Sequence, residues 1–195
     1  MLKQYKINWC IDAVSTDDPT TDTRDVLLFQ LISEIANDSN SSKLREDITK
    51  WLVGLEASDG KHGYDDDFHP IEVKPKNFTG KTKLNGGGQF TDFTWARDAK
   101  YSRDNVIMLI SGFQYGKILF IVEFKYESIR NKIRKHLERI LPTGDLINRY
   151  VRSASFSYLD WAQTPFTVKY LSPYIMHHKY CITTGLYKLL MSSKN

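Results

Sequence analysis

Two continuous apolar runs constrain the fold of this 195-residue chain more than any other feature. They occupy residues 106–110 (Val-Ile-Met-Leu-Ile) and 118–122 (Ile-Leu-Phe-Ile-Val), with seven residues between them. Apolar runs of this length without polar alternation are typical of strands that are buried on both faces. We therefore expect two neighbouring central strands in a sheet whose faces are both covered by other elements.

Helices and a further strand are expected on either side of this pair. Apolar residues recur at helical spacing over about 24–37, 43–56 and 127–141. A short helix is also expected within 90–101, and a short apolar strand at 70–73.

The remaining stretches show no regular pattern. Residues 75–88 read as a loop that contains three consecutive glycines, and 145–195 read as aromatic and irregular. Helices before, between and after a few strands predict a mixed α/β (α+β) domain, and the length suits a single domain over 1–195.

The net charge of +4 hides an uneven distribution. Residues 1–70 carry 7 Lys+Arg against 14 Asp+Glu, a net charge of −7, whereas 71–195 carry 20 against 9, a net charge of +11. A basic segment of this size can neutralise phosphates, so it favours a polyanionic partner.

Targeting and membrane segments are not expected. No run approaches 18 apolar residues, the length of a membrane-spanning helix, and the first ten residues contain no apolar stretch of signal-peptide length. The chain has two cysteines, Cys10 and Cys181, which make neither a disulfide framework nor a four-cysteine metal site. We therefore expect a cytoplasmic protein without a membrane partner.

The segment 63–74 brings together residue types that carry chemistry. In the strand at its end, Ile71 and Val73 point to one face, so Glu72 and Lys74 share the other. A turn over 66–69 would bring Asp65 toward Glu72.

Two carboxylates and an ammonium group would then converge. Carboxylate pairs bind Mg²⁺, which also coordinates phosphate and activates a bound water. A lysine beside the metal can orient that water and offset charge that develops on the phosphate. The arrangement predicts hydrolysis of a phosphodiester.

These residues resemble the signature of the PD-(D/E)XK nucleases. The likeness lies in Gly63-Tyr64-Asp65 followed by Ile71-Glu72-Val73-Lys74, although Tyr64 stands where the signature has a proline. The resemblance covers about 25–125, and it implies a restriction-endonuclease-like core, a central mixed sheet flanked by helices.

By the same resemblance, Asp65 and Glu72 are metal ligands for Mg²⁺, with Mn²⁺ as a substitute, and Lys74 is the catalytic lysine. The protein is then an endonuclease that cuts double-stranded DNA, most similar to a type II restriction endonuclease that acts as a homodimer. Residues 126–195 would serve DNA recognition or dimerisation.

Several assignments stay open at this point. Asp66 or Asp67 can take the role of Asp65. Many family members place a further glutamate on an upstream helix, for which the candidates are Glu34, Glu46 and Glu56.

A second Glu-x-Lys sequence competes with the first. Glu123 and Lys125 end the second long apolar strand, and Asp104 precedes its partner. The compact layout around Glu72 favours the first site.

Basic and polar residues follow the signature and are candidate DNA contacts within the nuclease interpretation. Two other functions stay open: a junction-resolving or repair nuclease of the same fold, and a non-catalytic DNA-binding or interaction module. The candidate contacts are Lys76, Lys83, Asn85, Gln89 and Arg97.

Overall fold

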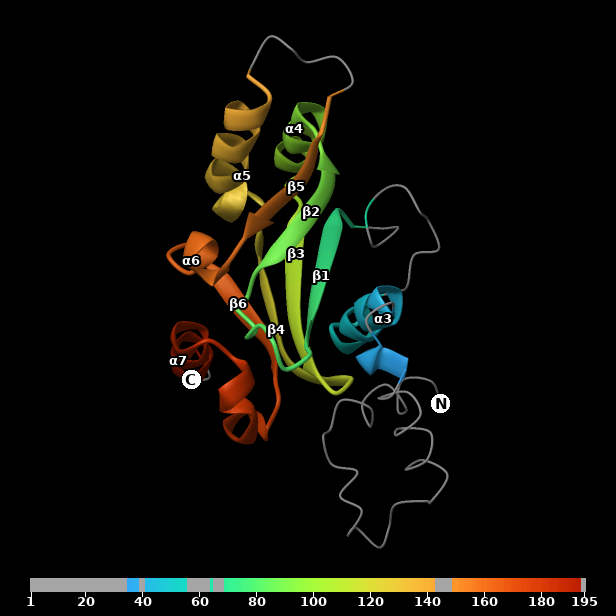
Figure 1. The fold of residues 1–195 in the computed structure, drawn as a ribbon, viewed down its shortest axis with the longest axis vertical. Coiled ribbons are helices and arrows are strands. Elements are labelled where there is room, and N and C mark those ends of the chain that lie inside the picture. Colours follow the sequence, from blue (N-terminus) through green and yellow to red (C-terminus); the bar gives the residue numbers. More distant parts are fainter. Residues whose placement is uncertain (1–34, 39–40, 56–63, 65–68, 143–148, 194–195) are drawn as a thin grey trace, which may run out of the picture.

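The computed structural model describes residues 35–38, 41–55, 64, 69–142 and 149–193 (Figure 1). Its helices and strands, in chain order, are α3 (Ser42–Leu52), β1 (Ile71–Phe78), β2 (Gly88–Phe93), α4 (Trp95–Arg103), β3 (Ile107–Gln114), β4 (Lys117–Lys125), α5 (Glu127–Ile140), β5 (Val151–Phe156), α6 (Tyr158–Trp161), β6 (Phe166–Leu171), the 3₁₀ helix η1 (Ile175–Cys181) and α7 (Thr184–Ser192).

A four-stranded sheet forms the centre, in the order β1-β3-β4-β6. β1 runs parallel to β3, whereas β3 with β4 and β4 with β6 are antiparallel pairs. The expected fold class, a mixed α/β protein with a mixed central sheet flanked by helices, is confirmed (Figure 1).

The two apolar runs lie in β3 and β4, as predicted, except that Val106 just precedes β3, and both strands continue past the ends of the runs. Gln114 pairs with Lys117, so only Tyr115 and Gly116 make the turn between them. Both turn residues have positive φ, 48° and 73°, as in the two-residue turns whose twist matches that of the flanking strands.

One face of the sheet packs against α3. Ile48 of this helix belongs to the same buried cluster as Ile71 and Val73 of β1 and Leu109 of β3. The helix expected over 43–56 is thus confirmed, although it ends earlier.

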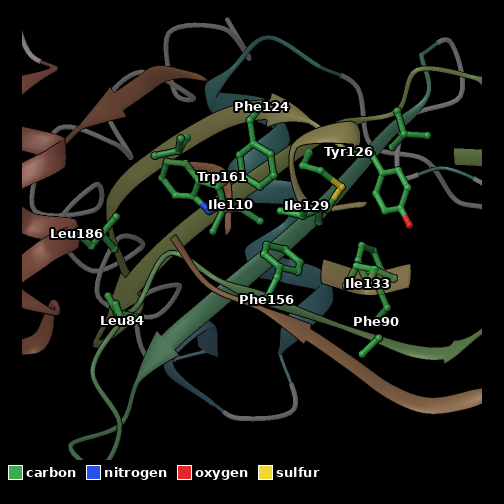
Figure 2. Close-up of a cluster of buried hydrophobic side chains, with 14 of the residues drawn as sticks. Leu84, Phe90, Ile110, Phe124, Tyr126, Ile129, Ile133, Phe156, Trp161 and Leu186 are labelled. Atoms are coloured by element: carbon green, nitrogen blue, oxygen red, sulfur yellow. The ribbon is translucent and has the colours of Figure 1, made fainter. Parts of the chain in front are cut away.

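The opposite face is covered by a two-stranded ribbon, β2 with β5, together with α5, α6 and α7. Figure 2 shows how the ribbon contributes Phe90 and Phe156 to the core, next to Phe124 of the sheet. The rings of Phe124 and Trp161 stack with centroids 5.1 Å apart. The helix predicted over 127–141 is confirmed as α5, and it buries Ile129 and Ile133 here.

The glycines at 86–88 let the ribbon approach the core, rather than forming an exposed loop. Gly86 has φ 59°, and its carbonyl accepts a hydrogen bond of 2.8 Å from Nε1 of buried Trp161. A Cβ on Gly87 would overlap the backbone carbonyl oxygen of Phe156, and one on Gly88 would lie 2.9 Å from Cβ of Lys74. Only glycine allows backbones and side chains to come so close.

The predictions for 75–101 were partly wrong. β1 continues through Pro75 to Phe78, which an edge strand tolerates, and among the described strands β1 is at the edge of its sheet. The helix expected over 90–101 starts only at Trp95, because Thr94 caps it by accepting a hydrogen bond from Arg97 N at 3.0 Å. The preceding residues form β2.

The C-terminal part is ordered rather than irregular, which corrects the prediction for 145–195. Its described residues form β5, α6, β6, η1 and α7. Of the helix expected over 24–37, only the last residues lie within the described part of the chain. Among the described helices, none has the length and apolar character needed to cross a membrane.

The close approach at Gly87 can be tested by replacing it with alanine. We expect Gly87→Ala to lower the free energy of unfolding by about 1–3 kcal/mol, because the added Cβ meets backbone that cannot rotate away. Urea denaturation measures the change. Thr82→Ala, an exposed position in the same loop, is the control and should stay within about 0.5 kcal/mol of the wild type. Equal stability of the two variants would contradict the packing role of Gly87.

Candidate active site

Glu72 and Lys74 lie on the same face of β1, and they contact each other. The Lys74 ammonium donates to Oε1 of Glu72, whereas Ile71 and Val73 pack against the α3 side of the sheet. The alternation predicted from the sequence is therefore confirmed. It places the pair beneath the β2–β5 ribbon and away from α3.

Glu72 is a buried carboxylate, with 3% of its surface exposed. Burial of an ionised carboxylate is costly unless donors replace the lost water. The Tyr101 hydroxyl donates to Oε2, and Nη2 of Arg97 lies 3.4 Å from Oε1, next to Lys74. Both oxygens therefore have partners, and one carboxylate faces two cations.

Arg97 and Tyr101 reach Glu72 together because they lie four residues apart on α4. Two guanidinium nitrogens of Arg97, Nε and Nη2, donate to the Tyr101 hydroxyl at 3.0 and 2.6 Å. The guanidinium carbon also lies 5.5 Å from the ring centroid of Phe93. The Arg97 side chain remains 34% exposed, so it connects the buried carboxylate with the surface.

Lys74 is positioned by the ribbon that crosses it. Gly88 leaves space for the lysine stem, and the ammonium lies 5.4 Å from the ring centroid of Phe90. With 22% of its side chain exposed, Lys74 is close to solvent while bonded to Glu72.

A second buried carboxylate, Asp98, lies on α4, about one turn before Tyr101. It accepts hydrogen bonds from the Tyr126 hydroxyl at 2.9 Å and from Arg130 at 3.2 and 3.3 Å. The rings of Tyr101 and Tyr126 meet edge to face with centroids 5.2 Å apart. The two carboxylates are therefore linked through a pair of buried tyrosines, which anchors α4 to both β1 and α5.

The environment alters the acidity of these tyrosines. Burial raises the pKa of Tyr101 far above its ordinary value, and the neighbouring Glu72 carboxylate raises it further. Burial likewise raises the pKa of Tyr126, with Asp98 adding to the shift. Both hydroxyls thus remain protonated and act as donors to their carboxylates.

The predicted metal ligands are only partly within the described residues. Asp65, Asp66 and Asp67 lie outside them, as do Glu34 and Glu56. Glu46 is on α3, which packs on the sheet face opposite to Glu72.

Tyr64, the residue before Asp65 in the sequence, is described. Its ring centroid lies 5.9 Å from that of Tyr101, and its hydroxyl donates to Asp104 at 2.5 Å.

The five predicted DNA contacts do not form one cluster. Arg97 lies at Glu72, whereas Lys76 is exposed two residues beyond Lys74 on the same face of β1. Gln89 is on the outer face of the ribbon, where it donates to Oγ of Ser153 at 2.7 Å. The other two, Lys83 and Asn85, are exposed in the loop before β2, and the Asn85 side chain accepts from Gly87 N.

The competing Glu-x-Lys sequence is on a different part of the sheet. Glu123 is paired in the sheet with Leu109, whose side chain packs with α3. The Glu123 carboxylate forms an ion pair of 3.3 Å with Lys169 of β6. Asp104 instead has Tyr64, Lys100 and Arg103 as partners. An open cleft of about 520 Å³ lies beside Glu123 and Lys125, between the start of α5 and the segment that leads into β6.

The groups around Glu72 fit a divalent cation in part. A carboxylate oxygen is the ligand that Mg²⁺ prefers, and Oε1 of Glu72 already holds the cationic group of Lys74. Within the described residues, no three His, Cys, Asp or Glu side chains are grouped so that they could hold a metal ion. Asp65, the second ligand that the family resemblance implies, lies outside the described residues.

Comparison of the chain with known proteins identifies no family for it. No protein-family model matches the chain, and a search of curated proteins also finds no match.

The sequence interpretation missed Tyr101, Asp98, Tyr126 and Arg130. The spacing of Arg97 and Tyr101 on one helix face was visible, but the sequence did not show that this face meets β1. Buried tyrosines and a buried aspartate look the same in a sequence as surface residues.

The buried tyrosines predict how stability depends on pH. Above pH of about 10, the ordinary pKa of tyrosine, the unfolded chain loses protons that folded Tyr101 and Tyr126 retain. The free energy of unfolding should therefore fall as pH rises, by about 1.4 kcal/mol per pH unit for each such tyrosine. Tyr101→Phe should remove the contribution of one tyrosine to this slope. It should also lower the free energy of unfolding at neutral pH by about 1–3 kcal/mol.

Urea denaturation at a series of alkaline pH values measures both effects. Tyr150→Phe is the matched control, because this side chain is 56% exposed, and it should leave the slope unchanged. An identical slope in Tyr101→Phe and wild type would show that Tyr101 ionises as readily in the folded protein as in the unfolded chain.

Proposed function

We propose that this protein is a Mg²⁺-dependent endodeoxyribonuclease with a PD-(D/E)XK-type site. The observation that carries the proposal is the buried Glu72 carboxylate in contact with the Lys74 ammonium on one face of β1. A buried acid and a partly exposed lysine, side by side on a rigid strand, suit the positioning that phosphodiester hydrolysis requires. The mixed sheet with helices on both faces is compatible with the restriction-endonuclease-like core.

In this proposal, Glu72 and Asp65 would hold the cation, and a cation bound there would supply a water of lowered pKa and a positive charge toward the scissile phosphate. Lys74 orients the attacking water and offsets the negative charge that grows on the phosphate. Tyr101 holds the Glu72 carboxylate in place through Oε2. Tyr64, next to Asp65 in the sequence, contacts the same tyrosine.

The charges at the site suit an anionic substrate. Glu72 provides one negative charge, while Lys74 and Arg97 provide two positive ones. Lys76 continues the basic character along the same face of β1. Arg97, whose side chain is 34% exposed, can contact a phosphate of the substrate.

Double-stranded DNA is the proposed substrate, cut at a specific site as a type II restriction endonuclease does. A homodimer would match the two-fold symmetry of a palindromic site. The whole chain would act as one nuclease domain in the cytoplasm. A junction-resolving or repair nuclease is the alternative within the same chemistry.

One observation favours a second candidate, a DNA-binding module without catalysis. Both oxygens of Glu72 already have partners, so the carboxylate can serve as the centre of a buried polar network. In that case Lys74 and Arg97 contact phosphates, and Glu72 only holds them in place.

Replacing Glu72 by glutamine tests its proposed role in cleavage. Glu72→Gln keeps the shape and a carbonyl acceptor, but loses the charge that holds a cation. We expect cleavage of plasmid DNA with Mg²⁺ to slow by roughly a hundredfold or more. Gel analysis of the plasmid measures the rate, and urea denaturation confirms that the variant is folded.

Glu123→Gln is the matched control, because it alters the competing Glu-x-Lys sequence. It should cleave like the wild type. Loss of cleavage in Glu123→Gln with full activity in Glu72→Gln would move the site to the other sequence. A wild type that binds duplex DNA but leaves plasmid intact with Mg²⁺ and with Mn²⁺ would favour the non-catalytic module.

Lys76 provides a test of the proposed DNA path along β1. Lys76→Ala should weaken duplex binding and reduce the slope of log affinity against log salt by about 0.9, the share of one phosphate contact. Fluorescence anisotropy in EDTA measures affinity without cleavage. Lys125→Ala, an exposed lysine at the end of β4, is the control and should keep the wild-type slope. Equal slopes in all three proteins would place the DNA elsewhere.

A further inference from the structure

Three segments that lie far apart in the sequence meet at the end of the sheet remote from α4 and α5 (Figure 1). They are the loop before β2, the turn between β3 and β4, and the stretch around η1. A bridge pairs Leu84 with Ile182, and the buried Gln114 amide bonds the Tyr180 hydroxyl and the His178 ring. We call the exposed part of this end the distal surface, which comprises Lys83, Tyr115, Tyr174, His177, Lys179 and Tyr180.

The distal surface is basic because its segments contain no acidic residue. Neither 75–91, nor 111–118, nor 161–195 includes an aspartate or a glutamate. Each segment contains a lysine: Lys83 and Lys179 belong to the distal surface, and the half-buried Lys117 lies beside it. Such clustering of one sign of charge attracts a polyanion.

Aromatic side chains stand among these lysines. Tyr115 is 63% exposed, Tyr180 54% and Tyr174 40%. Two adjacent hollows of about 400 and 240 Å³ share His177. Lys83, Lys179 and Tyr180 line the first, and Lys117 and Tyr174 line the second.

Tyr115 occupies a backbone position that does not suit it. It has φ 48° at the first position of a two-residue turn, where asparagine followed by glycine is favoured. The other two non-glycine residues with positive φ in the described chain are Asp92 and Asn105, whose side chains tolerate this region. A strained residue whose exposed ring offsets little of that cost points to a role outside folding.

We propose that the distal surface binds single-stranded nucleic acid, with bases stacked on its tyrosines and phosphates held by its lysines. Unpaired bases offer ring faces for stacking, whereas a duplex has already stacked them on each other. Exposed aromatics interleaved with lysines therefore fit a single strand better than a duplex. This binding needs neither Glu72 nor a metal, so it goes beyond the proposed cleavage.

Binding of a labelled oligothymidylate in EDTA, followed by fluorescence anisotropy, tests the proposal. Tyr115→Asn is the central variant, because it relieves the backbone strain and removes the ring. We expect it to raise the urea midpoint of unfolding while it weakens oligothymidylate binding by about fivefold or more. Lys179→Ala should flatten the dependence of log affinity on log salt by about 0.7.

The matched controls lie at other parts of the molecule. Tyr150→Asn removes an exposed tyrosine just before β5, and Lys135→Ala removes an exposed lysine of α5. Both should bind like the wild type. Glu72→Gln should bind the oligonucleotide normally even if it no longer cleaves plasmid, so failure of the nuclease proposal leaves this test intact.

Three results would overturn the proposal. One is oligothymidylate binding that is absent in the wild type or unchanged in both Tyr115→Asn and Lys179→Ala. Another is tighter binding of a duplex of the same length, if Tyr115→Asn weakens it. The third is self-association of the wild type in sedimentation that Tyr115→Asn abolishes, since the distal surface would then be an interface between copies of the chain.

Discussion

The burial of the Glu72 carboxylate is the constraint on which the arrangement around β1 depends. Glu72 must find donors inside the protein, and they come from β1 itself and from α4. Tyr101 then joins the edge-to-face contact with Tyr126, whose hydroxyl donates to Asp98. Satisfying one buried charge therefore determines where a whole helix lies.

The ribbon of β2 and β5 also packs against this site, through its contact with Lys74. Gly88 passes over the stem of Lys74 with no space for a side chain, and Phe90 follows beside the ammonium. The glycines thus serve packing inside the molecule. They let the ribbon pack directly on the stem of Lys74, next to its contact with Glu72.

Local patterns predicted those elements whose surroundings are simple. β3 and β4 are buried on both faces, so their apolar runs stand out, and α5 shows a clear apolar stripe. β2 could not be predicted in this way, because its partner β5 lies more than 50 residues later and its short pattern also fits a helix. The same holds for the site: the period of a strand placed Glu72 beside Lys74, but only tertiary contacts bring Arg97 and Tyr101 to them.

The hydrogen-bonded groups around Glu72 and the exposed groups of the distal surface differ in their chemistry. At the start of β1, the aromatic hydroxyls are buried and serve as donors to carboxylates, so they hold charges in fixed positions. At the far ends of β1 and β3, the tyrosines are exposed and no carboxylate accompanies them in the sequence segments that meet there. Fixed, paired charges suit chemistry at one defined bond, whereas exposed rings and clustered lysines suit an extended, sequence-tolerant partner. Because β1 connects the two, with the exposed Lys76 between them, a strand of nucleic acid bound at the distal surface would pass a basic side chain on its way toward Glu72.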